Sequence, residues 1–217
     1  MTEKRDLAAG DFSSWLDEIL EALRGEHGSS VPCGTCTACC TSSQFILIEP
    51  DETDTLARIP TELLFPAPRL PRGHVLLGYD ERGHCPMLID GKCTIYDDRP
   101  RTCRTYDCRI FPAAGLEPDE DAKAEITEQV RRWKFSYSDD VGRTLHDSVR
   151  AAATYLRVNA VSLPEGAVPK SATQLAVAAI EAHDAFLMVD EGAGATSVVD
   201  PEPEAVRLAL TRRTLRA

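Results

Sequence analysis

The sequence predicts an α+β fold, predominantly helical, in which a small irregular cysteine-rich unit with short strands is flanked by N- and C-terminal helices. Two observations support this class. All eight cysteines lie between residues 33 and 108, and the sequence on either side has apolar side chains at the three-and-four spacing of helices. We therefore expect three domains: an N-terminal helix and linker (1–32), a cysteine-rich domain (33–111) and a helical C-terminal extension (112–217).

Residues 11–25 predict an amphipathic packing helix. Its apolar side chains recur every three or four positions, Asp11 or Ser13 can cap its start, and Gly25 can end it. The glycines, serines and proline of residues 25–32 disfavour further helix and lead the chain to Cys33.

The cysteine-rich segment predicts several short elements. Residues 43–50 are apolar and predict a strand, and residues 50–60 have an acidic start that suits a short helix. The remaining expectations are an irregular proline-rich connection (60–73), two hairpins in series (74–96) with turns at 80–83 and 90–92, and a helical turn with Pro100 at its first position.

The C-terminal part predicts helices without cysteine. In the second of them, Leu145, Val149 and Leu156 line one apolar face together with Ala152. The predicted helices cover residues 119–135, 138–158, 171–187 and 204–216, with a flexible break at 191–204.

Length and charge limit the classes of protein. A chain of 217 residues can bury a core without cross-links. Residues 1–15 carry charges and do not resemble a signal peptide, and no apolar run reaches membrane-spanning length, so we expect a cytoplasmic protein without a membrane partner. The formal net charge of −11 disfavours nucleic-acid binding, which normally needs a basic surface.

The eight cysteines fall into two groups separated by a long gap. A dense thiol pattern in a reducing compartment is more typical of a metal or redox site than of disulfides. A C-x2-C step lets two sulfurs converge on one metal, and a remote second group completes the coordination. The candidate metal- and cofactor-binding residues are Cys33, Cys36, Cys39, Cys40, Cys85, Cys93, Cys103 and Cys108.

Cys39 and Cys40 are adjacent, and the side chains of neighbouring residues in an extended backbone point apart. We therefore expect these two thiols to serve different atoms. The possibilities are two irons of one cluster, two separate metals, or one ligand and one buried thiol.

The identity of the metal stays open between zinc and iron. Eight thiolates suit two closed zinc sites, whereas a 4Fe-4S cluster needs four cysteines and leaves the others over. The C-x2-C-x2-C spacing is similar to that of bacterial ferredoxins and favours the cluster. Four disulfides, or cysteines buried as small apolar side chains, are disfavoured by the compartment and by the clustering.

Charged and aromatic residues surround the second group. The arginines at 99, 101, 104 and 109 either offset the charge of metal-bound thiolates or form surface salt bridges with Asp97, Asp98 and Asp107. We expect Tyr96 and Tyr106 to pack in the core, and His84 to be solvated rather than a ligand.

The cysteine motifs resemble a known family. The run CGTCTACC (33–40) and the block CPMLIDGKCTIYDDRPRTCRTYDC (85–108) are similar to the YkgJ-type cysteine-cluster family, whose CxxCxxCC signature marks zinc- or iron-chelating domains. The resemblance covers about residues 33–111 and implies a metal centre built by cysteines of both groups. Flagellin lysine N-methylases carry a related cysteine cluster associated with iron–sulfur chemistry, so the resemblance also admits an enzyme.

The sequence therefore predicts a metal-binding protein whose iron–sulfur cluster or zinc has a structural or electron-transfer role. One alternative is a cluster-dependent enzyme, either a protein-modifying transferase with lysine N-methylase-like activity or an oxidoreductase. The other is a zinc-stabilised interaction adaptor. No catalytic residue is identified, and the expected partner is the metal ion or cluster.

Overall fold

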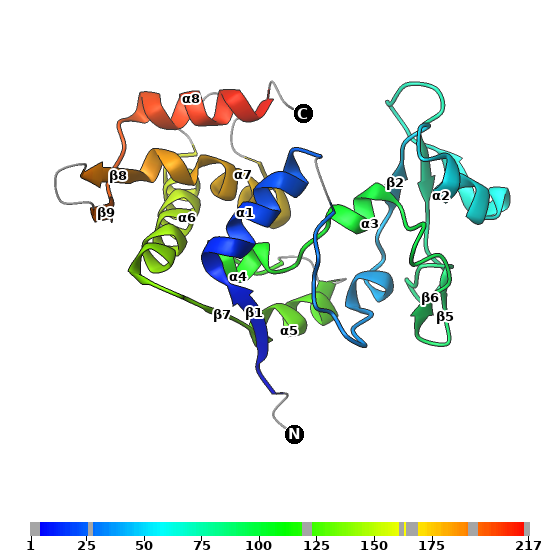
Figure 1. Cartoon of the computed structure of the whole chain (residues 1–217). Helices are drawn as coiled ribbons and strands as arrows, with labels where there is room; N and C mark the ends of the chain where they lie inside the picture. The colour runs from blue at the N-terminus through cyan, green and yellow to red at the C-terminus, as the bar shows by residue number, and fades with distance from the viewer. Residues whose placement is uncertain are drawn as a thin grey trace. The chain divides into compact units, whose positions relative to one another are not determined.

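The computed structural model describes residues 5–25, 28–118, 123–160, 163, 169–190 and 195–214. The predictions that fall on residues 26–27, 119–122, 191–194 and 215–216 lie outside this part of the chain. The chain divides into two compact units, the first made of residues 1–24, 108–119 and 130–217, and the second of residues 25–107 and 120–129 (Figure 1). Helices are accompanied by short strands, as expected for the predicted α+β class.

The first unit begins with a short strand and the predicted N-terminal helix. Helix α1 (Phe12–Leu23) starts after Asp11, whose carboxylate accepts a hydrogen bond of 3.2 Å from the Ser14 N–H, so Asp11 is the cap. Phe12, Trp15, Leu16 and Ile19 are buried, as their helical spacing predicts. The helix prediction is confirmed.

A parallel strand pair was not predicted. Strand β1 (Leu7–Asp11) pairs with β7 (Trp133–Ser136) in parallel, with a bulge between Ala8 and Gly10. Residues 119–135 were expected to form one helix, but α5 (Ala124–Arg132) stops at Arg132 and the chain continues as a strand. The β-forming residues Trp133 and Phe135 gain a paired backbone and a buried face in this way.

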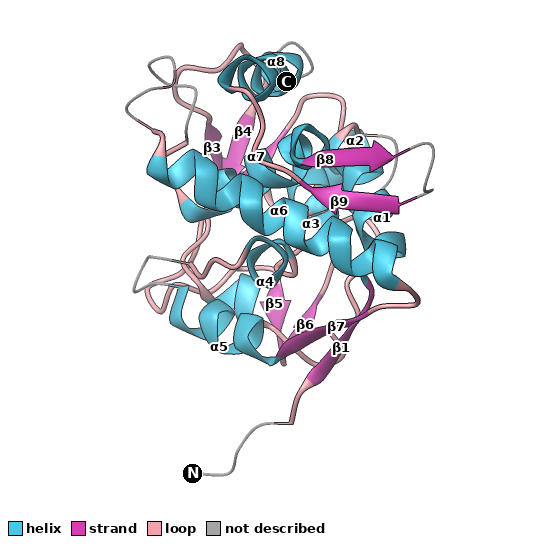
Figure 2. Cartoon of the chain, turned by 90° about the vertical axis from the view of Figure 1, so that its left-hand side faces the viewer, coloured by secondary structure: helices cyan, strands magenta, loops and turns pink. Residues whose placement is uncertain are grey.

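Helix α6 (Asp140–Val158) is the long central helix of the first unit (Figure 2). Asp139 caps it by accepting a 2.8 Å hydrogen bond from the Gly142 N–H, and Val149, Ala152 and Leu156 are buried along the predicted face. Around it lie α4 (Ile110–Ala114), α7 (Ala172–Ala182) and a 3-10 turn (His183–Phe186).

The C-terminal end contains a hairpin that replaces part of the predicted flexible break. Strand β8 (Leu187–Asp190) pairs antiparallel with β9 (Ala195–Val198), and β9 lies beside α6 (Figure 2). Helix α8 (Pro203–Thr214) follows, as predicted, and packs on α7.

The second unit is built on a three-stranded antiparallel sheet in the order β2–β4–β3. Strand β2 was predicted, whereas β3 lies within the proline-rich stretch expected to be irregular. The turn at 80–83 forms through a 2.9 Å hydrogen bond from the Gly83 N–H to the Asp80 carbonyl, but β4 pairs with β2 and β3 rather than with a strand after that turn. The strands are β2 (Ile46–Ile48), β3 (Leu64–Pro66) and β4 (Val75–Leu77).

The other elements of the second unit are short. The second predicted hairpin is confirmed: β5 and β6 pair across a turn in which Asp90 and Gly91 have φ of 51° and 73°. The elements are a 3-10 turn η1 (Ala38–Thr41), α2 (Thr53–Arg58), a 3-10 turn (Thr61–Leu63), β5 (Leu88–Ile89), β6 (Lys92–Cys93) and α3 (Arg101–Thr105).

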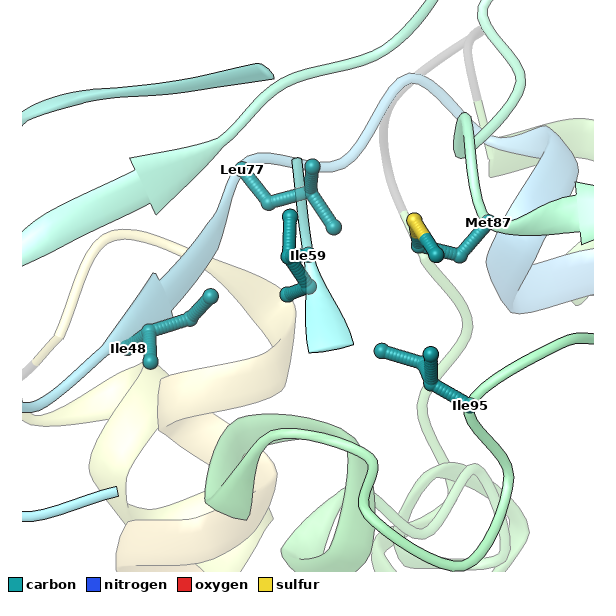
Figure 3. Close-up of a cluster of buried hydrophobic side chains, with 5 residues drawn as sticks. All are labelled: Ile48, Ile59, Leu77, Met87 and Ile95. Atoms are coloured by element: carbon teal, nitrogen blue, oxygen red, sulfur yellow. The ribbon is translucent and has the colours of Figure 1, made fainter. Parts of the chain in front are cut away.

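The core of the second unit is a small aliphatic cluster. Figure 3 shows its five buried side chains, with Cys85 and Cys93 packed against the cluster in partly buried positions. The five are Ile48, Ile59, Leu77, Met87 and Ile95.

Among the described residues, no helix is both long and apolar enough to cross a membrane.

Candidate metal centre

Seven of the eight cysteines belong to the second unit, and backbone hydrogen bonds fix the two groups to each other. The Cys85 N–H donates a hydrogen bond of 2.7 Å to the Cys40 carbonyl oxygen. Within the first group, the Cys36 N–H donates to the Cys33 carbonyl at 3.0 Å and the Cys40 N–H to that of Thr37 at 2.8 Å. The predicted meeting of the two remote segments is therefore present in the backbone.

Cys85 and Cys93 lie on opposite arms of the β5–β6 hairpin. Leu88 is the strand partner of Cys93, and its N–H donates to the Cys85 carbonyl at 2.9 Å. Burial raises the pKa of the Cys85 thiol, while the nearby backbone N–H groups of Met87 and Leu88 act in the opposite direction. This turn thus places backbone N–H groups near the sulfur, where they favour the thiolate.

Cys103 comes from the first turn of α3. Pro100 is the N-cap residue rather than the first helical residue, and its carbonyl accepts from the Cys103 N–H at 2.8 Å. The Thr102 hydroxyl donates to the Leu47 carbonyl at 2.7 Å, which fastens this helix to β2. Cys103 is thereby held against the sheet that carries the small core.

Four thiols act on one another electrostatically. Burial, followed by the charges of Cys40, Cys85 and Cys93, raises the pKa of Cys103 to about 12, while Arg99 acts in the opposite direction. Burial, followed by the charges of Cys85 and Cys93, raises the pKa of Cys40 to about 11. Since Cys93 also raises the pKa of Cys85, every pair among Cys40, Cys85, Cys93 and Cys103 interacts.

The remaining cysteines of the first group are arranged around Cys40. The charges of Cys36 and Cys33 contribute to the raised pKa of Cys40, whereas Cys39 is not among its main causes. Cys39 and Cys40 stand in the 3-10 turn η1 and not in the extended backbone assumed from the sequence. Adjacent side chains in such a turn still diverge, by about 120°, because it has three residues per turn.

Cys108 is different, because it belongs to the first unit. It is 5% exposed, and its sulfur accepts a 3.2 Å hydrogen bond from the indole N–H of Trp133 on β7. The indole of Trp133 is itself buried. The sequence analysis missed this contact, since nothing in the spacing of the two residues connects them.

No disulfide joins any of the eight cysteines, all of which lie in the described part of the chain. Within that part, no group of three or more histidine, cysteine, aspartate or glutamate side chains already stands at metal-ligand geometry. Each thiol turns about one side-chain torsion, so the four coupled thiols need side-chain rotation to meet at a common point.

The donor set is nevertheless suited to a soft metal. Thiolates are the ligands preferred by zinc and iron–sulfur clusters, and ionising four partly buried thiols that interact with one another is unfavourable without a cation among them. Burial is the main cause of the raised pKa values of Cys40, Cys85 and Cys103, and the charges of neighbouring thiolates add to it. A metal cation bound among these thiols would favour their ionised form.

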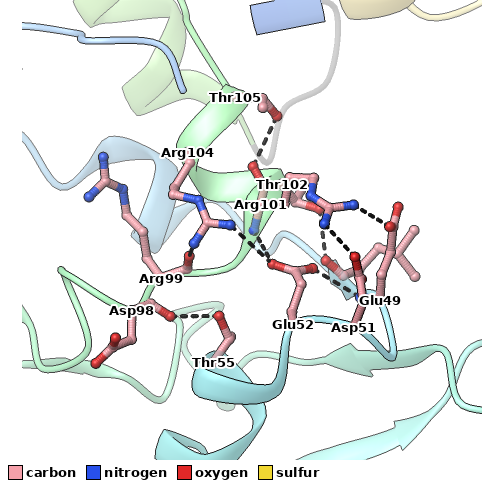
Figure 4. Close-up of polar contacts among 11 residues, drawn as sticks. Glu49, Asp51, Glu52, Thr55, Asp98, Arg99, Arg101, Thr102, Arg104 and Thr105 are labelled. Atoms are coloured by element: carbon pink, nitrogen blue, oxygen red, sulfur yellow. Dashed lines mark hydrogen bonds and ion pairs between the residues drawn. The ribbon is translucent and has the colours of Figure 1, made fainter. Parts of the chain in front are cut away.

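The arginines near α3 mostly pair with carboxylates. Figure 4 shows Arg101 bridging Glu49 and Asp51, and Arg104 facing Glu52 at 3.7 Å. Glu52 is buried and also accepts hydrogen bonds from the N–H groups of Glu49 and Arg101. The salt bridges with Asp97, Asp98 and Asp107 that the sequence suggested are therefore wrong for Arg101 and Arg104.

The other arginines and aromatic residues have separate roles. Arg99 stacks over the ring of Tyr96 at 4.2 Å and contributes positive charge near Cys103. Tyr96 is 60% exposed, so the expected core packing of this residue is wrong. Arg109 lies in the first unit and donates to the Ala9 carbonyl at 2.9 Å. His84 is half-buried, and its backbone N–H donates to the Asp80 carboxylate.

The comparisons with known proteins gave one family match. Residues 32–130 match the family model CxxCxxCC, described as "Putative zinc- or iron-chelating domain". No curated protein and no solved structure matches the chain. The matched segment contains all eight cysteines and confirms the resemblance inferred from the CGTCTACC run.

Proposed function

We propose that the second unit is a metal-binding module in which Cys40, Cys85, Cys93 and Cys103 hold a zinc ion or an iron–sulfur cluster. The observation that carries this proposal is the 2.7 Å hydrogen bond from the Cys85 N–H to the Cys40 carbonyl, which joins the two cysteine groups. The electrostatic interaction of the four thiols, which come from three separate stretches of sequence, supports it. The family match to a zinc- or iron-chelating domain supports it. Cys33, Cys36 and Cys39 then remain as ligands of a second metal or as outer thiols of the same centre.

The role we propose for the metal is primarily structural, and electron transfer becomes available if the metal is an iron–sulfur cluster. The buried aliphatic cluster of the second unit has five members, and two of the proposed ligands, Cys85 and Cys93, pack directly against it. A core of this size stabilises a domain weakly, and metal-binding free energy acts directly as folding free energy in such units. A reducing cytoplasm keeps the thiols available for the metal.

The surrounding charges support an anionic metal–thiolate centre. Arg99 acts on Cys103, and the N–H groups of Met87 and Leu88 act on the Cys85 sulfur. Four thiolates around a divalent cation leave net negative charge, and both kinds of group offset it.

The experiment is anaerobic purification of the full chain followed by metal analysis, sulfide analysis and an absorption spectrum. A cluster gives brown protein with iron and acid-labile sulfide, whereas zinc gives colourless protein with about one or two zinc ions per chain. Folded protein that contains neither metal and whose cysteines have become disulfides contradicts the proposal.

A further inference from the structure

The first unit contains a cavity that the metal centre does not use. Its volume is about 300 Å³, and its lining comes from the end of α4, from β7 and from α6. Small-molecule sites in proteins begin at about this volume and typically combine apolar walls with a few convergent polar groups. The lining of this cavity has both.

Aromatic side chains form the apolar part of the lining. Trp133 and Phe135 alternate on β7 and so share one face of the strand, and Tyr137 follows directly after it. Aromatic side chains in the lining give the cavity an apolar wall against which an apolar or aromatic group can pack.

The charged part of the lining is cationic. Glu117 is the carboxylate of the lining, and Arg131 already neutralises it through two hydrogen bonds of 2.7 and 2.6 Å. Lys134 and Arg150 are the cations left over. The chain as a whole has a net charge of −11, whereas these two cations, which no carboxylate of the lining neutralises, make the charge at the cavity positive.

Arg150 is the cation best suited to bind a ligand. It projects from α6 and is exposed, and among the described residues its guanidinium has no hydrogen-bond or ion-pair partner. Beside it Gly115, at the end of α4 with φ of +66°, has no side chain; a Cβ there would lie 3.8 Å from the Arg150 side chain. A guanidinium binds carboxylates and phosphates through two parallel hydrogen bonds.

The polar floor of the cavity is preorganised and neutral. The Nε2 atom of His146 lies 3.3 Å from the Pro112 carbonyl oxygen and therefore carries the ring proton. The other ring nitrogen, Nδ1, then accepts from the Tyr137 hydroxyl at 2.7 Å. Burial lowers the pKa of His146 to about 4, so the ring adds no charge at neutral pH.

We infer that this cavity binds a small organic anion, a carboxylate or phosphate carried on an aromatic or apolar body. The anionic group pairs with Arg150, and the apolar body packs against the aromatic side chains of the lining; Lys134, whose ammonium donates to the Arg131 carbonyl at 3.1 Å, adds positive charge nearby. This inference is independent of the metal, because every residue that it uses belongs to the first unit.

The test uses the full chain as purified and four probes: benzoate, phenyl phosphate, inorganic phosphate and the uncharged benzamide. Binding is followed by NMR. The chain has two tryptophans, so its NMR spectrum contains two indole N–H signals, and the signal that disappears in a Trp133→Phe variant belongs to Trp133. We expect benzoate or phenyl phosphate to shift the Trp133 signal until the site is saturated. The probe that binds more tightly shows whether the site prefers a carboxylate or a phosphate. Benzamide should bind at least about tenfold more weakly, because it lacks the charge that Arg150 pairs with.

Two arginine variants supply the matched control. Arg150→Gln should weaken binding of the preferred probe about tenfold or more, whereas Arg157→Gln, an exposed arginine on the same helix outside the cavity lining, should leave it unchanged. The inference is overturned if neither organic anion shifts Trp133, if benzamide binds equally well, or if Arg150→Gln has no effect. If inorganic phosphate binds as tightly as phenyl phosphate, the aromatic side chains of the lining do not contribute to binding.

Discussion

The backbone N–H of Cys85 donates a 2.7 Å hydrogen bond to the carbonyl oxygen of Cys40. This bond ties the two cysteine groups together independently of any metal. It places the start of the β5–β6 hairpin beside the turn η1, so that the thiols of Cys40, Cys85 and Cys93 lie within electrostatic range of one another. The backbone therefore brings the two cysteine groups together before any metal binds, as the proposed centre requires.

Serine replacement should separate ligands from bystanders. Cys40→Ser, Cys85→Ser, Cys93→Ser and Cys103→Ser should each lower the metal content of the purified protein by most of its value, because a hydroxyl is a poor ligand for a soft metal. Metal analysis of each variant is the measurement.

Cys108→Ser is the matched control for these variants. Its sulfur accepts from the Trp133 indole in the first unit, so we expect wild-type metal content and at most a modest loss of stability. Complete loss of metal in Cys108→Ser, with full retention in Cys103→Ser, would reverse our assignment of ligands.

Metal removal should loosen the second unit. After chelation, the amide protons of Cys85 and Leu88 should exchange with solvent at least about tenfold faster. The Cys85 N–H bonds to the Cys40 carbonyl and the Leu88 N–H to the Cys85 carbonyl, and the metal no longer stabilises these two contacts. Amide hydrogen exchange followed by NMR measures this change. Unchanged protection at both amides in metal-free protein argues against a structural role for the metal.

Loss of the buried Glu52 carboxylate should destabilise the second unit. Its side chain is 2% exposed and accepts from the Glu49 N–H at 3.0 Å, besides facing Arg104. We expect Glu52→Gln to cost about 1–3 kcal/mol of unfolding free energy, because charge-assisted hydrogen bonds in a buried site are lost. Denaturant titration followed by hydrogen exchange of the Arg101 amide measures the loss.

The control for Glu52 is Asp51→Asn. Asp51 pairs with the Arg101 guanidinium, whereas Glu52 accepts from the Arg101 backbone N–H and faces Arg104. The Asp51 side chain is 64% exposed, so we expect no measurable change in stability. Equal effects of the two substitutions would show that burial of Glu52 is not what stabilises this part of the fold.

His146 should make the first unit acid-sensitive. In the folded state burial holds the pKa of His146 at about 4, whereas the unfolded chain takes up the proton near 6.5. Acid therefore favours the unfolded state, and the stability present above pH 6.5 falls as the pH drops to about 4, by up to about 3 kcal/mol.

Tryptophan fluorescence during denaturation reports on this unit, because both Trp15 and Trp133 belong to it. The unfolding free energy is compared at pH 7 and pH 5. The loss of unfolding free energy between these two pH values should be smaller in a His146→Asn variant that still folds. If an NMR titration of the folded protein gives His146 its unperturbed pKa, the stacking of its ring on Phe12 at 4.2 Å does not bury it as the structure indicates.

The sequence predicted the elements that depend on local periodicity. Phe12, Trp15 and Ile19 repeat at helical spacing, and α1 and α6 formed where such patterns occur. The β1–β7 pair was missed because Leu7 and its partner Trp133 are remote in sequence, and two short parallel strands have no turn signal between them. The β8–β9 hairpin was missed because a glycine-rich segment was taken as a break.

The candidate site was predictable in its residue types but not in its grouping. Cysteine spacing indicated a metal centre. It did not show that Cys108 lies in another unit than the other seven cysteines, where its sulfur accepts a hydrogen bond from Trp133. Nor could charge patterning give Arg101 and Arg104 their actual partners, because β2 brings Glu49 and Glu52 to α3 through tertiary packing. Pairing across long sequence separations is what a single sequence does not record.

X-ray absorption at the edge of the bound metal tests the central claim most directly. We predict a first shell made of sulfur alone, at about 2.3 Å for zinc, that is unchanged in Cys108→Ser and altered in any Cys103→Ser protein that retains metal. A first shell of nitrogen and oxygen atoms, or one that Cys103→Ser leaves untouched, contradicts the assignment of the metal to Cys40, Cys85, Cys93 and Cys103.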